Sequence, residues 1–311
     1  MPDKLAIHGG SPVRSTLLPY GRQQVDDDDI AAVVDVLKSD WLTTGPTVTA
    51  FEEAFARFVG AEHAVAVTNG TAALHAAMYA LGIGSGDEVI VSPMTFAASA
   101  NCVLYQGGVP VFADIDPQTL LIDPAQVEAK ISPRTKAIVA VDYGGQPCDY
   151  DALRDLAHRH GLAIVADACH ALGGSYRGQQ VGTLADLSTF SFHPVKPLTT
   201  GEGGMITTND AELAQRMRLF RNHGITTDHR QRAETGGFFY EMVDLGYNYR
   251  ITDIQCALGL SQLRKLPEYV QQRQKIAAYY DAAFAGVPAV LPLAARDDVS
   301  HAYHLYVVQL A

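Results

Sequence analysis

The sequence predicts an α/β fold with a mostly parallel central sheet sandwiched by helices, followed by a smaller α+β domain. Between residues 63 and 166, short apolar runs alternate with amphipathic stretches. Each run is apolar throughout, as expected of a parallel strand that is covered on both faces. After Asp167 the runs become shorter and long helical patterns follow, which indicates a second, smaller unit.

The composition is that of a globular protein and narrows the classes of partner. The 311 residues are 48% hydrophobic and 18% charged, and the formal net charge is −11. This acidic balance disfavours nucleic acid and anionic membranes as partners. No apolar run approaches the roughly 20 residues that cross a bilayer, and residues 1–15 do not resemble a signal peptide. The four cysteines form no CxxC pair, which fits free thiols in a cytoplasmic protein without a zinc site.

Two helices are predicted ahead of the sheet. The first follows Asp26–Asp29 and ends near Leu37, and four acids at a helix start suit the positive end of its dipole. We interpret these acids as a solvated first turn rather than a metal site. The second helix runs over 48–59 and has one phenylalanine-rich face, formed by Phe51, Phe55 and Phe58.

The alternating region follows, with strands and helices taking turns. The predicted strands are 63–68, 88–92, 109–113, 136–141 and 162–166. The predicted helices are 71–81, 95–105, a short one opened by Pro124, and 150–160, which Gly161 ends. Beyond it we expect strands at 187–192 and 204–208, and helices at 211–221, 252–266 and 267–284.

The end of the chain reads as one strand over 301–310. A strand without a partner leaves its backbone groups unsatisfied. We therefore expect a large domain at 1–246 and the start of a C-terminal domain at 247–311 that is incomplete here.

A candidate phosphate site follows the first strand of the alternating region. Ligands of parallel α/β sheets bind at the carboxyl ends of strands. Gly70 permits a tight turn, and Thr71 with Ala72 opens a helix whose N–H groups and dipole suit a phosphate. Taken alone, the same residues are better explained as an ordinary helix start. The chain contains no GxGxxG fingerprint and no P-loop, which argues against NAD and ATP.

A carboxylate and a lysine follow two later strands. Asp167 fits two descriptions equally well, a helix N-cap or the anionic partner of a protonated ring nitrogen. Lys196 lies between Pro194 and Pro197 among small and apolar neighbours, which favours a nucleophilic amine over a solvated charge. A phosphate cradle, a carboxylate and a lysine on different strands are the parts that bind pyridoxal phosphate.

From about Leu18 to Leu310, the chain resembles the DegT/DnrJ/EryC1/StrS sugar aminotransferases. These are fold-type I pyridoxal-phosphate-dependent transferases, with the architecture of aspartate aminotransferase. Within the family it is most similar to transaminases of the pseudaminic-acid pathway, through 135–143, 170–174, 196–204 and 304–306. The family motifs are Leu42-Thr-Thr-Gly-Pro46, Asn69-Gly-Thr-Ala-Ala-Leu74, Ser92-Pro-Met-Thr-Phe96, Asp167-Ala-Cys-His-Ala-Leu-Gly173, Ser191-Phe-His-Pro-Val-Lys196, Gly201-Glu-Gly-Gly204 and Gly246-Tyr-Asn-Tyr-Arg250.

The resemblance implies how the cofactor, pyridoxal 5′-phosphate, is held. Lys196 bonds to it covalently and then transfers protons, and Asp167 pairs with its ring nitrogen. The backbone N–H groups of Thr71 and Ala72 and the hydroxyl of Ser191 bind its phosphate.

Further residues are implied around the cofactor ring. Phe96 stacks on one face and Cys169, where the family more often has alanine, lies near the other. His170 reaches the ring oxygen O3′, with a packed core histidine as the alternative. Asn248 reaches the phosphate bound by the other subunit, which implies a homodimer with shared active sites.

The resemblance also implies a reaction. L-glutamate donates an amino group to C4 of a UDP-linked 4-keto-6-deoxy-N-acetyl hexose. The alternatives are another keto sugar nucleotide, either 3-keto or linked to dTDP or GDP, and a cyclitol. A sugar dehydratase of the same fold is disfavoured because it lacks the lysine found at Lys196. A non-catalytic PLP-binding regulator is disfavoured by the charge of −11 and by the absence of a DNA-binding segment.

Overall fold

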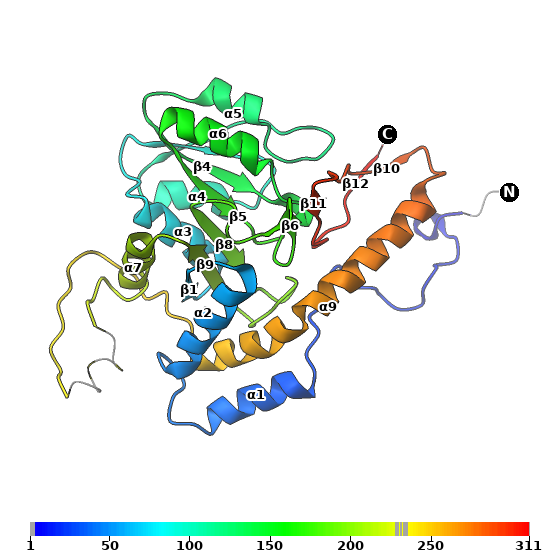
Figure 1. Cartoon of the computed structure of the whole chain (residues 1–311). Helices are drawn as coiled ribbons and strands as arrows, with labels where there is room; N and C mark the ends of the chain where they lie inside the picture. The colour runs from blue at the N-terminus through cyan, green and yellow to red at the C-terminus, as the bar shows by residue number, and fades with distance from the viewer. Residues whose placement is uncertain (1–3, 228–229, 231, 233–235, 311) are drawn as a thin grey trace.

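A seven-stranded sheet lies at the centre of the molecule (Figure 1). The computed structural model describes residues 4–227, 230, 232 and 236–310. The strand order is β1-β9-β8-β5-β4-β2-β3, and β9 runs antiparallel to both of its neighbours while the other neighbouring pairs are parallel. The mostly parallel sheet is thus confirmed. Its strands are β1 His63–Val67, β2 Glu88–Val91, β3 Val109–Phe112, β4 Thr135–Val141, β5 Ala163–Asp167, β8 Leu187–Ser191 and β9 Gly204–Thr208.

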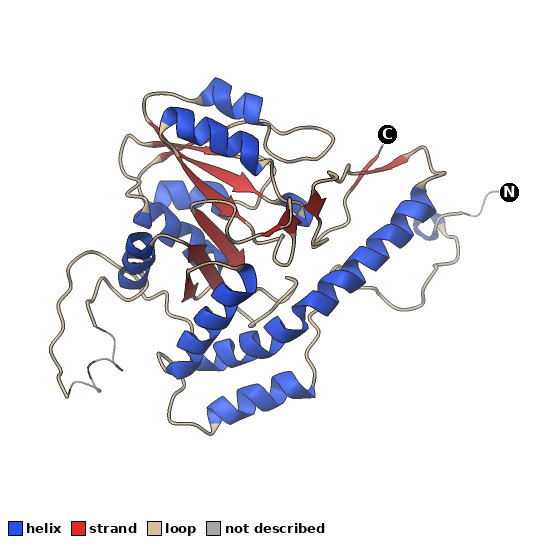
Figure 2. Cartoon of the chain, viewed as in Figure 1, coloured by secondary structure: helices blue, strands red, loops and turns tan. Residues whose placement is uncertain are grey.

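Helices cover both faces of this sheet (Figure 2). Successive side chains of a strand point to opposite faces, so Ala64 and Ala66 join one hydrophobic core and Val65 and Val67 the other. On the Ala64 side lie α2 Pro46–Val59, α5 Pro124–Lys130 and α6 Tyr150–His160. On the Val65 side lie α3 Gly70–Ala80, α4 Ala98–Tyr105 and α7 Ala211–Phe220.

The long helix α9, Asp253–Phe284, replaces the two helices expected at 252–266 and 267–284. Pro267 lies inside it and removes one backbone hydrogen bond, which normally kinks or breaks a helix. The residues around it, Leu263, Leu266 and Val270, are buried in the core on the α2 side of the sheet. This packing outweighs the local preference of the proline.

The acids at the start of α1, Asp27–Leu37, are only partly a solvated turn. Asp26 caps the helix in a reciprocal pair with Asp29. Asp29 is buried and accepts hydrogen bonds from Lys265 Nζ at 2.9 Å and Gln262 Nε2 at 2.6 Å. The expectation of full solvation is wrong for Asp29, because the acid joins α1 to α9. Across the described residues, no group of His, Cys, Asp and Glu is placed to bind a metal ion.

The C-terminal residues form less strand than expected. Only β12, Val308–Leu310, is a strand within 301–310, and it pairs with β10, Val290–Pro292. The segment before it forms hydrogen bonds with two glycines instead. Ala302 N–H donates to Gly145 O, and Leu305 N–H donates to Gly144 O. These bonds satisfy backbone groups that would otherwise need a partner strand. The expected strand over 301–307 is therefore wrong.

The remaining elements are short. A three-stranded sheet joins β11, Val299–Ser300, to β6, Ser175–Tyr176, and β7, Gln179–Gln180. The 3₁₀ helices are η1, Ala6–His8, and η2, Tyr143–Gly145. Of the helices in the described residues, none has the length and apolar character needed to span a bilayer.

Candidate active site

A cavity of about 480 Å³ lies at the carboxyl ends of the parallel strands. Residues at or after the ends of β1, β2, β4, β5 and β8 line it. Among the predicted site residues, the cavity brings together Gly70, Thr71, Phe96, Asp167, His170, Ser191 and Lys196. Ala72 and Asn248 are not among the lining residues.

Asp167 is the last residue of β5 and its carboxylate is buried at the cavity wall. Its Oδ2 accepts a hydrogen bond from Ser99 Oγ at 2.6 Å, and its Oδ1 accepts one from Cys169 N–H at 3.3 Å. Residues 169–173 form turns and no helix follows Asp167, so the helix N-cap description of Asp167 is wrong. The two bonds hold the carboxylate in one orientation at the cavity wall.

Lys196 lies in the connection between β8 and β9 and is half-buried. Its N–H donates to His193 O at 2.9 Å. The loop is tied further by Thr200 N–H and Thr199 Oγ1, which both donate to Phe192 O at 3.0 Å. The amine is therefore presented by a backbone that is fixed on both sides of it.

His170 lines the same cavity as a neutral imidazole. Burial, with the Lys196 charge adding to it, lowers the pKa of His170 to about 4. Its Nδ1 accepts a hydrogen bond from Gly144 N–H at 3.3 Å. Since Nδ1 is the acceptor, the ring proton is on Nε2. His170 also packs against the ring of His304, with centroids 4.4 Å apart, so it is both a packed histidine and a lining residue of the cavity.

The start of α3 has the shape of a phosphate cradle. Gly70 is its first residue, and a Cβ there would come within 2.8 Å of Ser191 Cβ. Only glycine therefore lets the helix start approach Ser191 this closely. Ala72 N–H already donates to Asn69 Oδ1 at 2.8 Å, so this amide is engaged in helix capping and is not a free phosphate donor, contrary to expectation.

The residues expected beside a cofactor ring are also at the cavity. Phe96 is 76% exposed, so its ring is accessible from the cavity side. Cys169 lines the cavity as well, and burial together with Asp167 raises the pKa of its thiol. The thiol is therefore protonated and acts as a neutral wall.

Sequence reasoning missed two of the contacts that organise this site. Ser99, which fixes Asp167, lies one helical turn after Thr95, and their hydroxyls are 2.6 Å apart. The sequence feature that could have identified Ser99 is a hydroxyl on the helix that follows β2. The Gly144 contact to His170 had no signal in the sequence, because β4 and β5 bring the two segments together.

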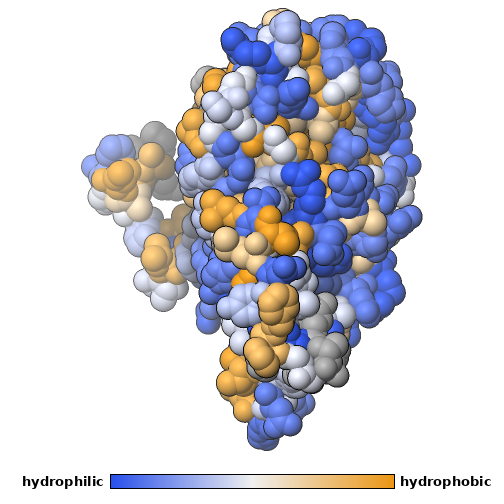
Figure 3. Space-filling view, turned by 90° about the vertical axis from the view of Figure 1, so that its left-hand side faces the viewer, coloured by the Kyte–Doolittle hydropathy of each residue, from blue (hydrophilic) through white to orange (hydrophobic). Residues whose placement is uncertain are grey.

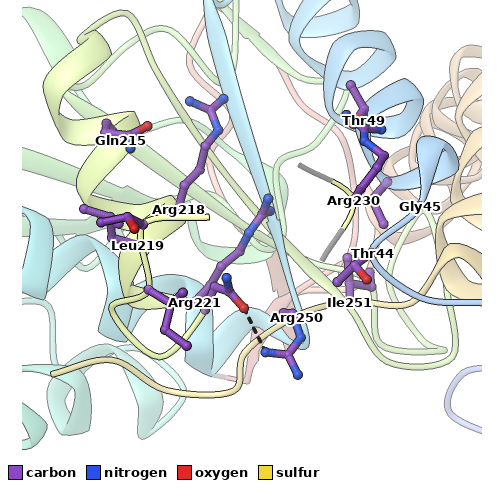
Figure 4. A pocket seen from close by; sticks show the side chains of 14 residues that line it. Thr44, Gly45, Thr49, Gln215, Arg218, Leu219, Arg221, Arg230, Arg250 and Ile251 are labelled. Carbon is purple, nitrogen blue, oxygen red and sulfur yellow. Dashed lines mark hydrogen bonds between the residues drawn. The ribbon is translucent and has the colours of Figure 1, made fainter. Parts of the chain in front are cut away.

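Asn248 lies outside the cavity, exposed and in a bridge with Asn222. A smaller cavity of about 130 Å³ adjoins this bridge (Figure 4). Arg250 Nη1 donates to Asn222 Oδ1 at 2.9 Å, and burial together with the Arg221 charge lowers the pKa of Arg250. The lining includes no acidic side chain among the described residues, and its arginines are Arg218, Arg221, Arg230 and Arg250.

Comparisons with known proteins agree with the geometry. The sequence profile of the DegT/DnrJ/EryC1/StrS aminotransferase family matches residues 23–311. The spore coat polysaccharide biosynthesis protein SpsC of Bacillus subtilis is 46% identical over 298 residues, which cover 96% of this chain and 77% of SpsC.

Solved structures share the fold. PseC of Helicobacter pylori, an aminotransferase involved in the biosynthesis of pseudoaminic acid, matches with a TM-score of 0.88 and 38% identity. That match covers 94% of this chain and 77% of PseC. Spr1654 of Streptococcus pneumoniae, solved in its PLP form, matches with a TM-score of 0.88 and 34% identity, covering 94% of this chain and 78% of Spr1654. The cavity with its lysine, carboxylate and glycine cradle suits that cofactor, and the chain therefore belongs to the DegT/DnrJ/EryC1/StrS family as a PLP-dependent sugar aminotransferase of fold type I.

Proposed function

We propose that the protein transfers the amino group of L-glutamate to C4 of a UDP-linked 4-keto-6-deoxy-N-acetyl hexose. The observation that carries the proposal is the cavity in which Lys196 and Asp167 lie together at the carboxyl ends of the strands. The choice of acceptor is supported by the 38% identity to PseC, which acts in pseudoaminic acid biosynthesis. The similarity to SpsC, a polysaccharide biosynthesis protein, also favours a sugar acceptor.

In this proposal the residues of the cavity bind the cofactor at its three polar positions. Thr71 and Ser191 would bind the phosphate, Asp167 would pair with the ring nitrogen, and His170 would donate its Nε2–H to the ring oxygen. When bound, PLP supplies an electron sink that takes an amino group from one substrate and gives it to the next.

Proton transfer is assigned to Lys196. Its Nζ removes the proton from Cα of glutamate and later delivers a proton to C4 of the sugar, so it serves as base and then as acid. Ser99 keeps the Asp167 carboxylate in one orientation through the bond at 2.6 Å. Gly144 keeps the proton of His170 on Nε2.

The proposed active unit is a homodimer in which Asn248 contacts the phosphate bound by the other subunit. Two features beside Asn248 favour this arrangement. Arg250 of the smaller cavity, whose Nη1 donates to the neutral Asn222 Oδ1, supplies positive charge for an anion. The projecting segment 236–247 exposes apolar side chains, seen as orange atoms next to the grey residues in the lower part of Figure 3. These are Phe238, Phe239, Tyr240, Met242, Val243 and Leu245.

A substrate panel tests the proposed reaction. The purified protein is incubated with L-glutamate and one keto sugar nucleotide at a time, and the product mass is read. The panel holds the UDP-linked 4-keto-6-deoxy-N-acetyl hexose, its dTDP- and GDP-linked 4-keto counterparts and a 3-keto sugar nucleotide. We expect amination of the UDP-linked 4-keto sugar at the highest rate. Preferential amination of another member would refute the proposed acceptor and leave the transaminase chemistry in place.

A further inference from the structure

A third cavity, of about 310 Å³, lies against Lys196. The β8–β9 connection contributes Pro194, Lys196 and Pro197 to its wall. The segment before α1 contributes Arg22, and α9 contributes Arg273. Lys196 lines this cavity and the active-site cavity alike. The two cavities therefore adjoin each other at Lys196.

The charges around this cavity are not balanced. No acidic side chain of the described residues lines it. Arg273 Nη1 donates only to backbone carbonyls, Tyr303 O at 3.1 Å and His304 O at 3.2 Å. Burial lowers the pKa of Arg273, which reflects the cost of a half-buried cation without a carboxylate beside it.

The acids closest in sequence to Arg22 are already engaged. Lys265 Nζ forms ion pairs with both Asp26 and Asp29. Arg22 itself is exposed and has no ion pair within the described part of the chain. Two guanidinium groups thus border one cavity without an anion to neutralise them.

We propose that this cavity binds the anionic oxygens of a transamination substrate while the substrate reacts at Lys196. The inference rests on the proposed function. The shared chemistry is a carboxylate or a phosphate, because the planar guanidinium donors match both groups with paired hydrogen bonds. L-glutamate supplies the first and the diphosphate of the sugar nucleotide supplies the second. Tyr269 also lines the cavity and supplies a neutral hydroxyl.

The test compares Arg22→Gln and Arg273→Gln with the wild-type protein in its cofactor-loaded form. Arg264→Gln is the matched control, because Arg264 is exposed on the same helix as Arg273 and does not line the cavity. Glutamate affinity is read from the concentration dependence of the change in cofactor absorbance without a sugar acceptor. UDP affinity is read by titration calorimetry.

We expect Arg22→Gln and Arg273→Gln each to weaken one of the two affinities about tenfold or more, since each variant loses a hydrogen bond between charged groups. Weaker glutamate binding identifies the carboxylate as the ligand, and weaker UDP binding identifies the diphosphate. Arg264→Gln should change neither. Arg273→Lys keeps the charge and should recover part of the lost affinity.

Unchanged affinities for both probes in Arg22→Gln and Arg273→Gln would overturn the inference. Arg22 is exposed and makes no contact that the fold needs, so Arg22→Gln decides the matter alone if Arg273→Gln does not fold. The proposed acceptor fails separately if the wild-type protein reacts with glutamate and aminates no UDP-linked sugar. The glutamate arm still decides the inference in that case.

Discussion

Two carboxyl groups lie at the ends of the adjacent strands β4 and β5 in different surroundings. Asp167 borders the active-site cavity and accepts hydrogen bonds from Ser99 and Cys169. Asp142 is buried, and its Oδ1 accepts bonds from Cys148 N–H and Tyr150 Oη–H at 2.9 Å each. Its Oδ2 has no hydrogen-bond partner in the described structure. Burial, with the Asp167 charge adding to it, raises the pKa of Asp142 to about 7.

The raised pKa of Asp142 predicts how stability depends on pH. Between about pH 4 and 7 the folded protein binds a proton that the unfolded chain releases, so wild-type stability falls as pH rises through this range. The fall amounts to about 4 kcal/mol at most, since one pKa unit corresponds to about 1.4 kcal/mol. Asp142→Asn keeps the Oδ1 acceptor and cannot ionise, so its stability should lack this fall. Urea denaturation at pH 5 and pH 8 measures it, with the exposed Asp35→Asn as control. Equal pH dependence in wild type and Asp142→Asn would contradict the assignment.

The second prediction at this scale concerns Lys196. Lys196→Ala should abolish the visible absorbance of the bound cofactor and all amino transfer, because no other lysine lines the active-site cavity in the described residues. Borohydride reduction followed by peptide mapping identifies the bonded residue. The exposed Lys130→Ala should retain absorbance and activity. A reduced adduct on any other lysine would show that the residue is misassigned.

At the scale of elements, one ion pair joins the first helix to the last. Lys265 on α9 lies between Asp26 and Asp29 of α1, and its side chain is 18% exposed while that of Asp29 is fully buried. Gln262, one turn earlier on α9, adds a hydrogen bond to Asp29. The contact fixes the N-terminal segment against α9, beside the cavity that Arg22 and Arg273 border.

Lys265→Met should therefore destabilise the protein by about 3–5 kcal/mol, because it leaves a buried carboxylate without its cation. Thermal or chemical denaturation at neutral pH measures the loss. Lys275→Met removes an exposed lysine of the same helix and should change stability little. Similar stability for both variants would mean that the hydrogen bonds from Gln262 and the helix cap stabilise the buried Asp29 carboxylate without Lys265.

Sequence periodicity located most elements because strands buried on both faces give continuous apolar runs. It failed where packing overrides the local signal. Pro267 favoured a helix end, yet α9 continues through it against the core. The 301–307 segment has strand-like residues, yet it bonds to Gly144 and Gly145. In the site, Asp167 and Lys196 could be predicted because each follows a strand. The bond between Gly144 and His170 depends on how two distant segments meet, which no local pattern encodes.

At the scale of the whole molecule, the surface around Asn248 has two features of an interaction site. It combines an arginine-lined cavity with the projecting segment 236–247, whose apolar side chains are exposed. Large exposed apolar groups bordered by polar ones mark interaction sites. A two-fold dimer would use this surface twice, once on each subunit.

Asn248→Ala should weaken cofactor retention and dimer association together, because ligand binding and association are linked when the site is shared. A dilution series measures both effects in one experiment: sedimentation reports dimer association, and absorbance reports cofactor retention. If Asn248 only turns the chain toward α9, the variant should keep its cofactor at every concentration. A wild-type monomer with full cofactor occupancy would exclude the shared site.

The pairing of β1 has a consequence for the growing chain on the ribosome. Among the described residues, β1 is an edge strand of the sheet and pairs with β9, which is made long after it. The turn from β1 into α3 holds Gly70, and a Cβ on Gly204 of β9 would lie within 2.4 Å of Asn69 O. The close contact between β9 and the start of α3 therefore forms only when β9 has emerged, and contacts this distant in sequence form late. Nascent chains stalled before β9 should not capture cofactor, while the released chain, which can assemble, should.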